Sequence, residues 1–172
     1  MANLFKRISD VLTANLNDLV DQVEDPERMI KQLIREMEEN VNSAREGVID
    51  ALASEKQLAK ELDNQRRQAD DWYNRARRAM ENGNETLARE ALMRKKEHDD
   101  IASNLQASWE SAKRTSERLK AQMRALETKL EEARQKKGRL EARQRAAQAR
   151  EQKDRESDRI QTGLDLNHTF HR

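Results

Sequence analysis

Apolar residues recur at alternating spacings of four and three through the first half of the chain, and this repeat constrains the fold more than any other feature. The repeat runs from Ile30 to Ala79, and only Glu55 and Gln65 interrupt it with polar side chains. Such spacing places its members on one stripe of an α-helix, which is typical of a coiled-coil seam. The members, which we call seam 1, are Ile30, Ile34, Met37, Val41, Ala44, Val48, Ala51, Glu55, Leu58, Leu62, Gln65, Ala69, Trp72, Ala76 and Ala79.

A second repeat of the same kind, seam 2, follows in the second half of the chain. It contains more polar members, so we expect it to pack less tightly against its partner helix. Between the two seams lies Asn82-Gly83-Asn84, in which Gly83 suits a left-handed helix C-cap and Asn84 suits the next N-cap. The chain is predicted to turn back there. The members of seam 2 are Ala91, Lys95, His98, Ala102, Leu105, Trp109, Ala112, Ser116, Leu119, Met123, Leu126, Leu130, Ala133, Lys137, Leu140, Gln144 and Ala147.

The charge distribution supports antiparallel pairing of the two seams. Residues 10–63 carry 14 acidic and 6 basic side chains, and residues 113–155 carry 15 basic and 7 acidic ones, although the net charge of the chain is only +1. If the chain folds back at residue 83, each residue of the first helix faces a residue of the second helix such that their two numbers sum to about 167. This register places the acidic stretch beside the basic one. Because rim ion pairs contribute only about 0–1 kcal/mol each, they select the orientation more than they stabilise it.

These signals predict an all-α fold, a long antiparallel helical hairpin preceded by an N-terminal amphipathic helix. Asp25-Pro26 reads as an N-cap followed by a proline at the first helical position. The expected segments are the N-terminal helix in residues 1–25, a hairpin in 26–160 (helix 26–81, tip 82–84, helix 85–160) and a flexible tail in 161–172. Gly138 is expected to interrupt the second helix, and residues 141–159 to be helical without firm packing.

Residues 3–24 form a separate amphipathic unit. The apolar side chains cover about half of a helical wheel, with the acidic Asp10, Asp18 and Asp21 opposite. Two interpretations fit this pattern: a helix lying in a membrane surface, or a helix packed on the hairpin or on a neighbouring copy. Phe5, Lys6 and Arg7 favour the membrane, and the acidic face opposes it. The predicted membrane-binding residues are Leu4, Phe5, Lys6, Arg7, Ile8, Val11, Leu12, Leu16 and Leu19.

The composition of this segment predicts how it would bind lipid. Lys6 and Arg7 offer only about 1 kcal/mol each towards anionic lipid, so insertion must be mainly hydrophobic, weak and reversible for one copy. Apolar residues outside the seams, such as Leu33 and Leu52, indicate burial against neighbouring copies, and many copies together convert weak binding into avidity. We therefore expect a homo-oligomer that prefers membranes with packing defects. Polar interruptions exclude a signal peptide, so we expect the chain in the cytoplasm.

Other functional classes find less support. With one proline and no cysteine, the chain excludes proline-rich linkers and disulfide-stapled domains, and no apolar run is long enough to span a bilayer. No phosphate-binding loop, nucleophile motif or metal-ligand spacing occurs, so we expect no enzyme activity, cofactor or metal. His98 is a seam-edge residue, because its neighbours Asp99 and Asp100 point in other directions on a helix.

Several alternatives remain open. Trp72 and Trp109 are either packing anchors or contacts with a partner, and the arginines near the tip either face solvent or pair with another subunit. Residues 113–155 would suit a nucleic-acid-binding module, but they lack aromatic residues for stacking, so no direct nucleic-acid contact is expected. A structural coiled coil without a membrane role is the other alternative.

Several ungapped segments resemble phage shock protein A and its relative, the vesicle-inducing protein in plastids. They are Leu4-Phe5-Lys6-Arg7-Ile8, Glu24-Asp25-Pro26-Glu27-Arg28-Met29-Ile30, Ile34-Arg35-Glu36-Met37-Glu38 and Gly83-Asn84-Glu85-Thr86-Leu87-Ala88-Arg89-Glu90-Ala91-Leu92. The resemblance covers roughly residues 1–150. It implies an ESCRT-III-like fold, peripheral attachment to the cytoplasmic face of the bacterial inner membrane, and assembly into rings or rods that stabilise or remodel that membrane. It also implies that the hairpin inhibits an AAA+ transcriptional activator, phage shock protein F, until membrane stress recruits it away.

Overall fold

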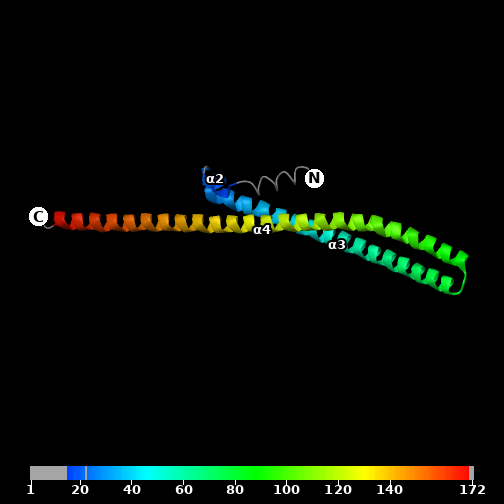
Figure 1. The fold of residues 1–172 in the computed structure, drawn as a ribbon. Coiled ribbons are helices and arrows are strands. Elements are labelled where there is room, and N and C mark those ends of the chain that lie inside the picture. Colours follow the sequence, from blue (N-terminus) through cyan, green and yellow to red (C-terminus); the bar gives the residue numbers. More distant parts are fainter. Residues whose placement is uncertain (1–14, 22, 171–172) are drawn as a thin grey trace. The chain divides into compact units, whose positions relative to one another are not determined.

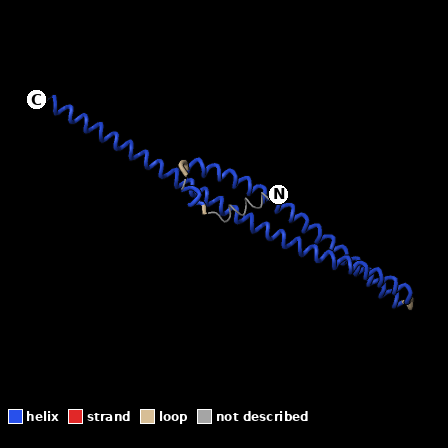
Figure 2. Tube along the Cα trace, turned by 90° about the horizontal axis from the view of Figure 1, so that it is seen from above, coloured by secondary structure: helices blue, strands red, loops and turns tan. Residues whose placement is uncertain are grey.

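The computed structural model describes residues 15–21 and 23–170, which form three helices. These are α2 (Leu16–Asp21), α3 (Pro26–Glu81) and α4 (Glu85–Phe170). The described part of the chain contains no strand (Figure 2). The contacts divide it into two compact units: unit 1 holds the residues up to Asn40 and from Leu126 onwards, and unit 2 is Val41–Ala125. The predicted all-α class is confirmed.

The hairpin tip is set by hydrogen bonds at the end of α3 and the start of α4. Gly83 adopts a left-handed backbone conformation with φ of 74°. Its N–H donates to the Met80 carbonyl at 3.0 Å, and the Asn84 N–H donates to the Ala79 carbonyl at 2.9 Å, which is the Schellman pattern. The Leu87 N–H then donates to the Asn84 side chain at 3.1 Å. The predicted C-cap and N-cap are therefore confirmed.

In unit 2, α3 and α4 run side by side in opposite directions (Figure 1). Every member of seam 1 from Val41 to Ala79 is buried or half-buried. Polar seam members meet each other across the hairpin. The Ser116 hydroxyl donates to Glu55 Oε2 at 2.6 Å, and His98 Nδ1 lies 2.7 Å from Gln65 Oε1. Both pairs lie within about one helical turn of the predicted register.

In unit 1, the seam includes several large apolar side chains. Ile30 and Met37 from α3 and Leu126 from α4 are among the most deeply buried residues of the chain. At the rim, Arg134 Nη2 lies 3.4 Å from Glu38 Oε1, and Lys136 Nζ lies 3.0 Å from Asp21 Oδ1. These pairs join residues of the basic stretch to residues of the acidic stretch, as antiparallel pairing predicts.

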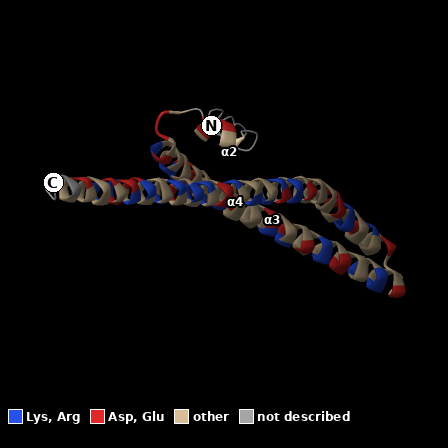
Figure 3. Cartoon of the chain, turned by 90° about the vertical axis from the view of Figure 1, so that its left-hand side faces the viewer, with Lys and Arg blue, Asp and Glu red and all other residues tan. Residues whose placement is uncertain are grey.

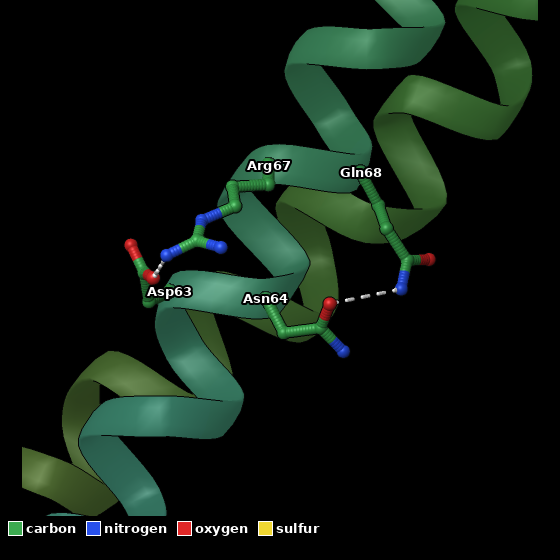
Figure 4. Close-up of polar contacts among 4 residues, drawn as sticks. All are labelled: Asp63, Asn64, Arg67 and Gln68. Atoms are coloured by element: carbon green, nitrogen blue, oxygen red, sulfur yellow. Dashed lines mark hydrogen bonds and ion pairs between the residues drawn. The ribbon is translucent and has the colours of Figure 1, made fainter.

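Acidic and basic residues are interleaved along both long helices (Figure 3). On α3, Arg67 pairs with Asp63 and the Gln68 amide donates to Asn64 Oδ1, each across one helical turn (Figure 4). On α4, Lys95 Nζ donates to Asp99 Oδ2 at 2.6 Å, and this hydrogen bond raises the pKa of Lys95. Such local pairs stabilise each helix separately and leave the pairing of helices to the seams.

Two expectations about the end of the chain are wrong. Gly138 does not interrupt α4, and the helix continues to Phe170, past the predicted end at residue 160 and through most of the predicted tail 161–172. A single glycine costs a helix only about 1 kcal/mol, and no proline follows it to stop the helix. The expected absence of firm packing is confirmed, because residues 142–167 are all exposed.

Candidate functional site

The predicted membrane-binding residues divide into two groups by position. Leu16 and Leu19 belong to α2, although the side chain of Leu19 lies outside the described part of the structure. The other seven, which lie in residues 4–12, are outside the described residues altogether. They are Leu4, Phe5, Lys6, Arg7, Ile8, Val11 and Leu12. The geometry that follows therefore concerns α2 and its junction with α3.

The short helix α2 begins with a local cap. The Asn17 N–H donates to Asn15 Oδ1 at 3.1 Å, which is the bond of an asparagine that starts a helix or turn. The sequence then places Leu16 and Val20 four residues apart, on one face of the helix. Leu16 is 7% exposed and Val20 is 0% exposed. The apolar face of α2 is thus covered by protein.

The covering surface belongs to α4. A hollow is lined jointly by Leu16 of α2 and by Lys129, Glu132, Lys136 and Arg139 of α4. Lys136 Nζ donates to Asp21 Oδ1 at 3.0 Å, while the stem of Lys136 is itself buried. A lysine stem often covers apolar surface while its ammonium group reaches a charged partner. For α2, the structure therefore shows packing on the hairpin, one of the two interpretations that the sequence left open.

Sequence reasoning missed two residues of this contact. Val20 follows Leu16 at the helical spacing of four, and this spacing was the available signal. Lys136 had no such signal, because seam 2 assigns its neighbour Lys137 to the stripe that faces α3. The buried position of Lys136 depends on α2, which no repeat in the sequence predicts.

The junction between α2 and α3 is short and polar. The Arg28 N–H donates to Asp25 Oδ1 at 3.3 Å, and the Met29 N–H donates to the Asp25 carbonyl at 3.2 Å, so Asp25 is the N-cap that the sequence predicted. Proline at the next position fixes the direction in which α3 starts. Val23 is partly exposed and lines a shallow hollow with Met29 and Leu33. The N-terminal segment is thus separated from α3 by a fixed cap.

The described residues contain no helix long and apolar enough to cross a membrane. Nor does that same part of the chain hold three or more His, Asp or Glu side chains grouped so that they would hold a metal ion.

Comparison with known proteins gives a consistent result. The family model described as "PspA/IM30 family" matches residues 3–165. The chain is 42% identical over 127 residues to the membrane-associated protein Vipp1 of Nostoc punctiforme, covering 74% of this chain and 49% of the relative. It is 38% identical over 128 residues to a phage shock protein A homolog of Deinococcus radiodurans (74% and 57%), and 33% identical over 127 residues to protein LiaH of Bacillus subtilis (74% and 56%).

The chain spans about half the length of these relatives. The matched region nevertheless includes nearly all of the described structure, and the residue segments that carry the resemblance lie within it. Together with the all-helical hairpin, this match establishes that the chain belongs to the PspA/IM30 family.

Proposed function

We propose that this chain is a peripheral membrane-stress protein. Its N-terminal segment binds the surface of the cytoplasmic membrane, and many copies assemble to stabilise or remodel it. The observation that carries the proposal is the amphipathic pattern of residues 3–24, which precedes the Asp25 cap and has an apolar face wider than a coiled-coil seam needs. The similarity to Vipp1, which is named a membrane-associated protein, supports it.

The packing of α2 suggests that different residues of the N-terminal segment contact lipid and attach the segment to the hairpin. Leu16 is buried against α4, so lipid contact by this residue would require α2 to leave the hairpin and break the Lys136–Asp21 pair. The amphipathic pattern also includes five large apolar positions before α2. We therefore assign the first lipid contact to Leu4, Phe5, Ile8, Val11 and Leu12, and we assign to Leu16 and Val20 the role of holding the segment on the hairpin.

Insertion is driven by apolar burial. A fully buried Leu, Ile or Phe side chain contributes about 1.5–3 kcal/mol, and the actual depth and the ordering of the helix reduce this sum. Lys6 and Arg7 add about 1 kcal/mol each on an anionic surface, where Asp10 and Asp18 are repelled. One copy then binds weakly, and a scaffold of many copies binds firmly. Existing packing defects lower the cost of insertion, because acyl surface is already exposed there.

The proposal includes two finer roles. Copies assemble into rings or rods, which the exposed apolar residues outside the seams favour: Ile49, Leu92, Met93 and Ile101 are all exposed in unit 2. The hairpin also inhibits an AAA+ transcriptional activator of the phage shock response, an expectation that rests on the family resemblance alone.

The test is flotation of the full chain with vesicles of phosphatidylcholine alone and of phosphatidylcholine with phosphatidylglycerol. Phe5→Glu and Ile8→Glu place a charge on the apolar face and are expected to abolish binding to both vesicle types. The helical content measured by circular dichroism should stay unchanged, because the hairpin seams are intact. The matched control is Ile160→Glu, the same change at an exposed position of α4.

Retained vesicle binding by Phe5→Glu and Ile8→Glu would contradict the proposal. Leu16→Glu tests whether Leu16 holds the segment on the hairpin. The substitution should lower the stability of unit 1, since it buries a charge between α2 and α4. If Leu16→Glu affects only vesicle binding and leaves the stability unchanged, the holding role of α2 is wrong.

A further inference from the structure

A hollow of about 490 Å³ lies near the tip of unit 2, between the end of α3 and the start of α4. Its lining includes Trp72, Arg75 and Arg78 of α3, and Leu87, Ala91 and Arg94 of α4. None of these residues belongs to the segment assigned to lipid. The hollow includes Trp72, which the sequence left open between packing and contact with a partner. It also includes Arg75 and Arg78, which the sequence left open between solvent exposure and pairing with another subunit.

The apolar part of the hollow is incompletely covered. Ala79 and Ala91 are buried at its base, whereas Leu87 is 52% exposed and Trp72 is half-buried. An exposed leucine beside a half-covered indole leaves room for one large aliphatic side chain from outside. Tryptophan and arginine are also the residues that most often dominate binding energy at protein interfaces.

The rim of the hollow is basic. The Arg75 guanidinium lies 4.5 Å from the centre of the Trp72 ring, and Arg94 Nη1 makes an exposed contact of 3.5 Å with Glu97. Arg78 makes no ion pair with any residue that the structure describes. The acidic residue of the lining is Glu90. Three guanidinium groups against one carboxylate favour an occupant that brings acidic side chains with its apolar one.

Such a group of side chains lies elsewhere on α3. Ile49 is 59% exposed and is the most exposed large aliphatic residue of unit 2 apart from methionine. Glu46 and Asp50, one turn apart, lie beside it, and neither makes an ion pair within the described residues. We call Glu46, Ile49 and Asp50 the knob.

Another acidic and apolar group fits less well. Ile101 on α4 is less exposed than Ile49, and its neighbour Glu97 is already paired with Arg94. A bilayer also fits less well than a helix, because a flat surface cannot enter the hollow between two helices.

We infer that the hollow receives the knob of a second copy, with Ile49 entering beside Trp72 and Leu87, and with Glu46 and Asp50 pairing with Arg78 and Arg94. The inference rests on the self-assembly in the proposed function and identifies one contact that produces it. The knob and the hollow lie on the same rigid helix α3, about 40 Å apart at 1.5 Å per residue, so one copy cannot fill its own hollow. Contact between two different surfaces is heterologous, and it repeats from copy to copy into a ring or an open filament.

The experiment measures assembly of the full chain by sedimentation velocity over a range of concentrations. The hollow variant carries Arg78→Glu and Arg94→Glu, and the knob variant carries Glu46→Arg and Asp50→Arg. Each alone should raise the concentration for half-assembly at least about tenfold, because like charges then face each other. An equimolar mixture of the two variants should assemble again, since each variant's surface then finds an opposite charge on the other.

The control is Arg114→Glu with Arg118→Glu, the same charge change on α4 outside the hollow. A second reading uses Trp109→Phe, which leaves Trp72 as the one tryptophan of the chain. The fluorescence of Trp72 should shift to shorter wavelength on assembly in this background. It should not shift when Ile49→Ala is added, because the indole then remains exposed to water.

Normal assembly by the hollow variant would overturn the inference while leaving self-assembly intact. A mixture that stays unassembled would overturn it too, as would a hollow variant that assembles but no longer binds anionic vesicles, since the arginines would then serve lipid. A parent chain that stays monomeric at every concentration and on vesicles would instead contradict both the proposed function and this contact.

Discussion

The seam of unit 1 and the seam of unit 2 follow the same repeat but use different chemistry. In unit 1, Ile30, Met37 and Leu126 are deeply buried apolar members of the seam. In unit 2, two seam positions are occupied by polar pairs, Glu55 with Ser116 and Gln65 with His98. The comparison indicates that the two kinds of layer have different effects. Apolar layers stabilise the pairing of the two helices, and matched polar layers specify which residues face each other.

The polar layers specify register because a slip would separate the partners. Ser116 is 1% exposed, and its hydroxyl also lies 3.0 Å from the Lys113 carbonyl. Moving α4 by one turn would separate the half-buried Glu55 carboxylate from Ser116, and a carboxylate that loses its hydrogen-bond partner inside a seam destabilises the pairing. The apolar layers of unit 1 offer no comparable penalty, since one aliphatic side chain can replace another.

The largest expected effect is a loss of stability when a buried apolar side chain of the unit 1 seam is removed. Met37→Ala should lower the free energy of unfolding by about 2–5 kcal/mol, because it removes a buried side chain and leaves a cavity. Met80→Ala, the same change at an exposed residue, is the control and should change it by less than about 0.5 kcal/mol. Urea unfolding followed by circular dichroism measures both. Equal effects of the two changes would show that the unit 1 seam is not packed as described.

The next effect concerns the polar layer. Ser116→Ala should cost about 1–3 kcal/mol in the same assay, because Glu55 loses its partner inside the seam. Adding Glu55→Leu should restore the stability to that of the parent or above, since the layer becomes apolar. The double-mutant cycle gives the coupling of the pair. A double variant that is less stable than Ser116→Ala would mean that this layer stabilises as well as specifies.

Glycine replacements should have smaller effects of opposite sign. Gly47 and Gly138 are helical, and a Cβ at either would meet nothing within 4 Å, so alanine should stabilise by about 0.5–1 kcal/mol. Gly83→Ala should destabilise by about 1–2 kcal/mol, because residue 83 adopts a positive φ. Thermal unfolding of the three variants checks this. Stabilisation by Gly83→Ala would contradict the Schellman cap at the tip.

The smallest effect is expected on the outer face of α3. Arg67→Ala removes an exposed pair with Asp63 and should change the stability by no more than about 0.5 kcal/mol (Figure 4). The difference should shrink further at high salt, since exposed charges are screened. A loss as large as that of Ser116→Ala would show that the outer face contributes to pairing.

Most of the hairpin was predictable because its sequence signals are local. A four-three repeat determines which face of a helix is buried, and Gly83 with Asn84 determines where the chain turns. The end of α4 was not predictable in this way. Gln144 and Ala147 continue the repeat but are exposed, and the helix passes Gly138 because one glycine weakens a helix without stopping it.

The candidate site was predictable only in part for a different reason. An amphipathic face is buried equally by lipid and by protein, so the pattern that includes Leu16 cannot distinguish the two. The structure assigns Leu16 and Val20 to protein, through a surface of α4 that includes Lys136. Which side chains of a distant helix cover a short one depends on tertiary packing, and no spacing in the sequence encodes it.

The short turn at Gly83 also sets the order in which the chain folds. The pair Gln65–His98 is separated by 33 residues in sequence, Glu55–Ser116 by 61 and Asp21–Lys136 by 115. Loop-closure entropy rises with each of these separations, so contacts nearest the turn form first and each shortens the loop for the next. The hairpin should therefore close like a zipper, and α2 should dock last. Pulsed hydrogen exchange during refolding would show protection spreading from residue 83 outwards.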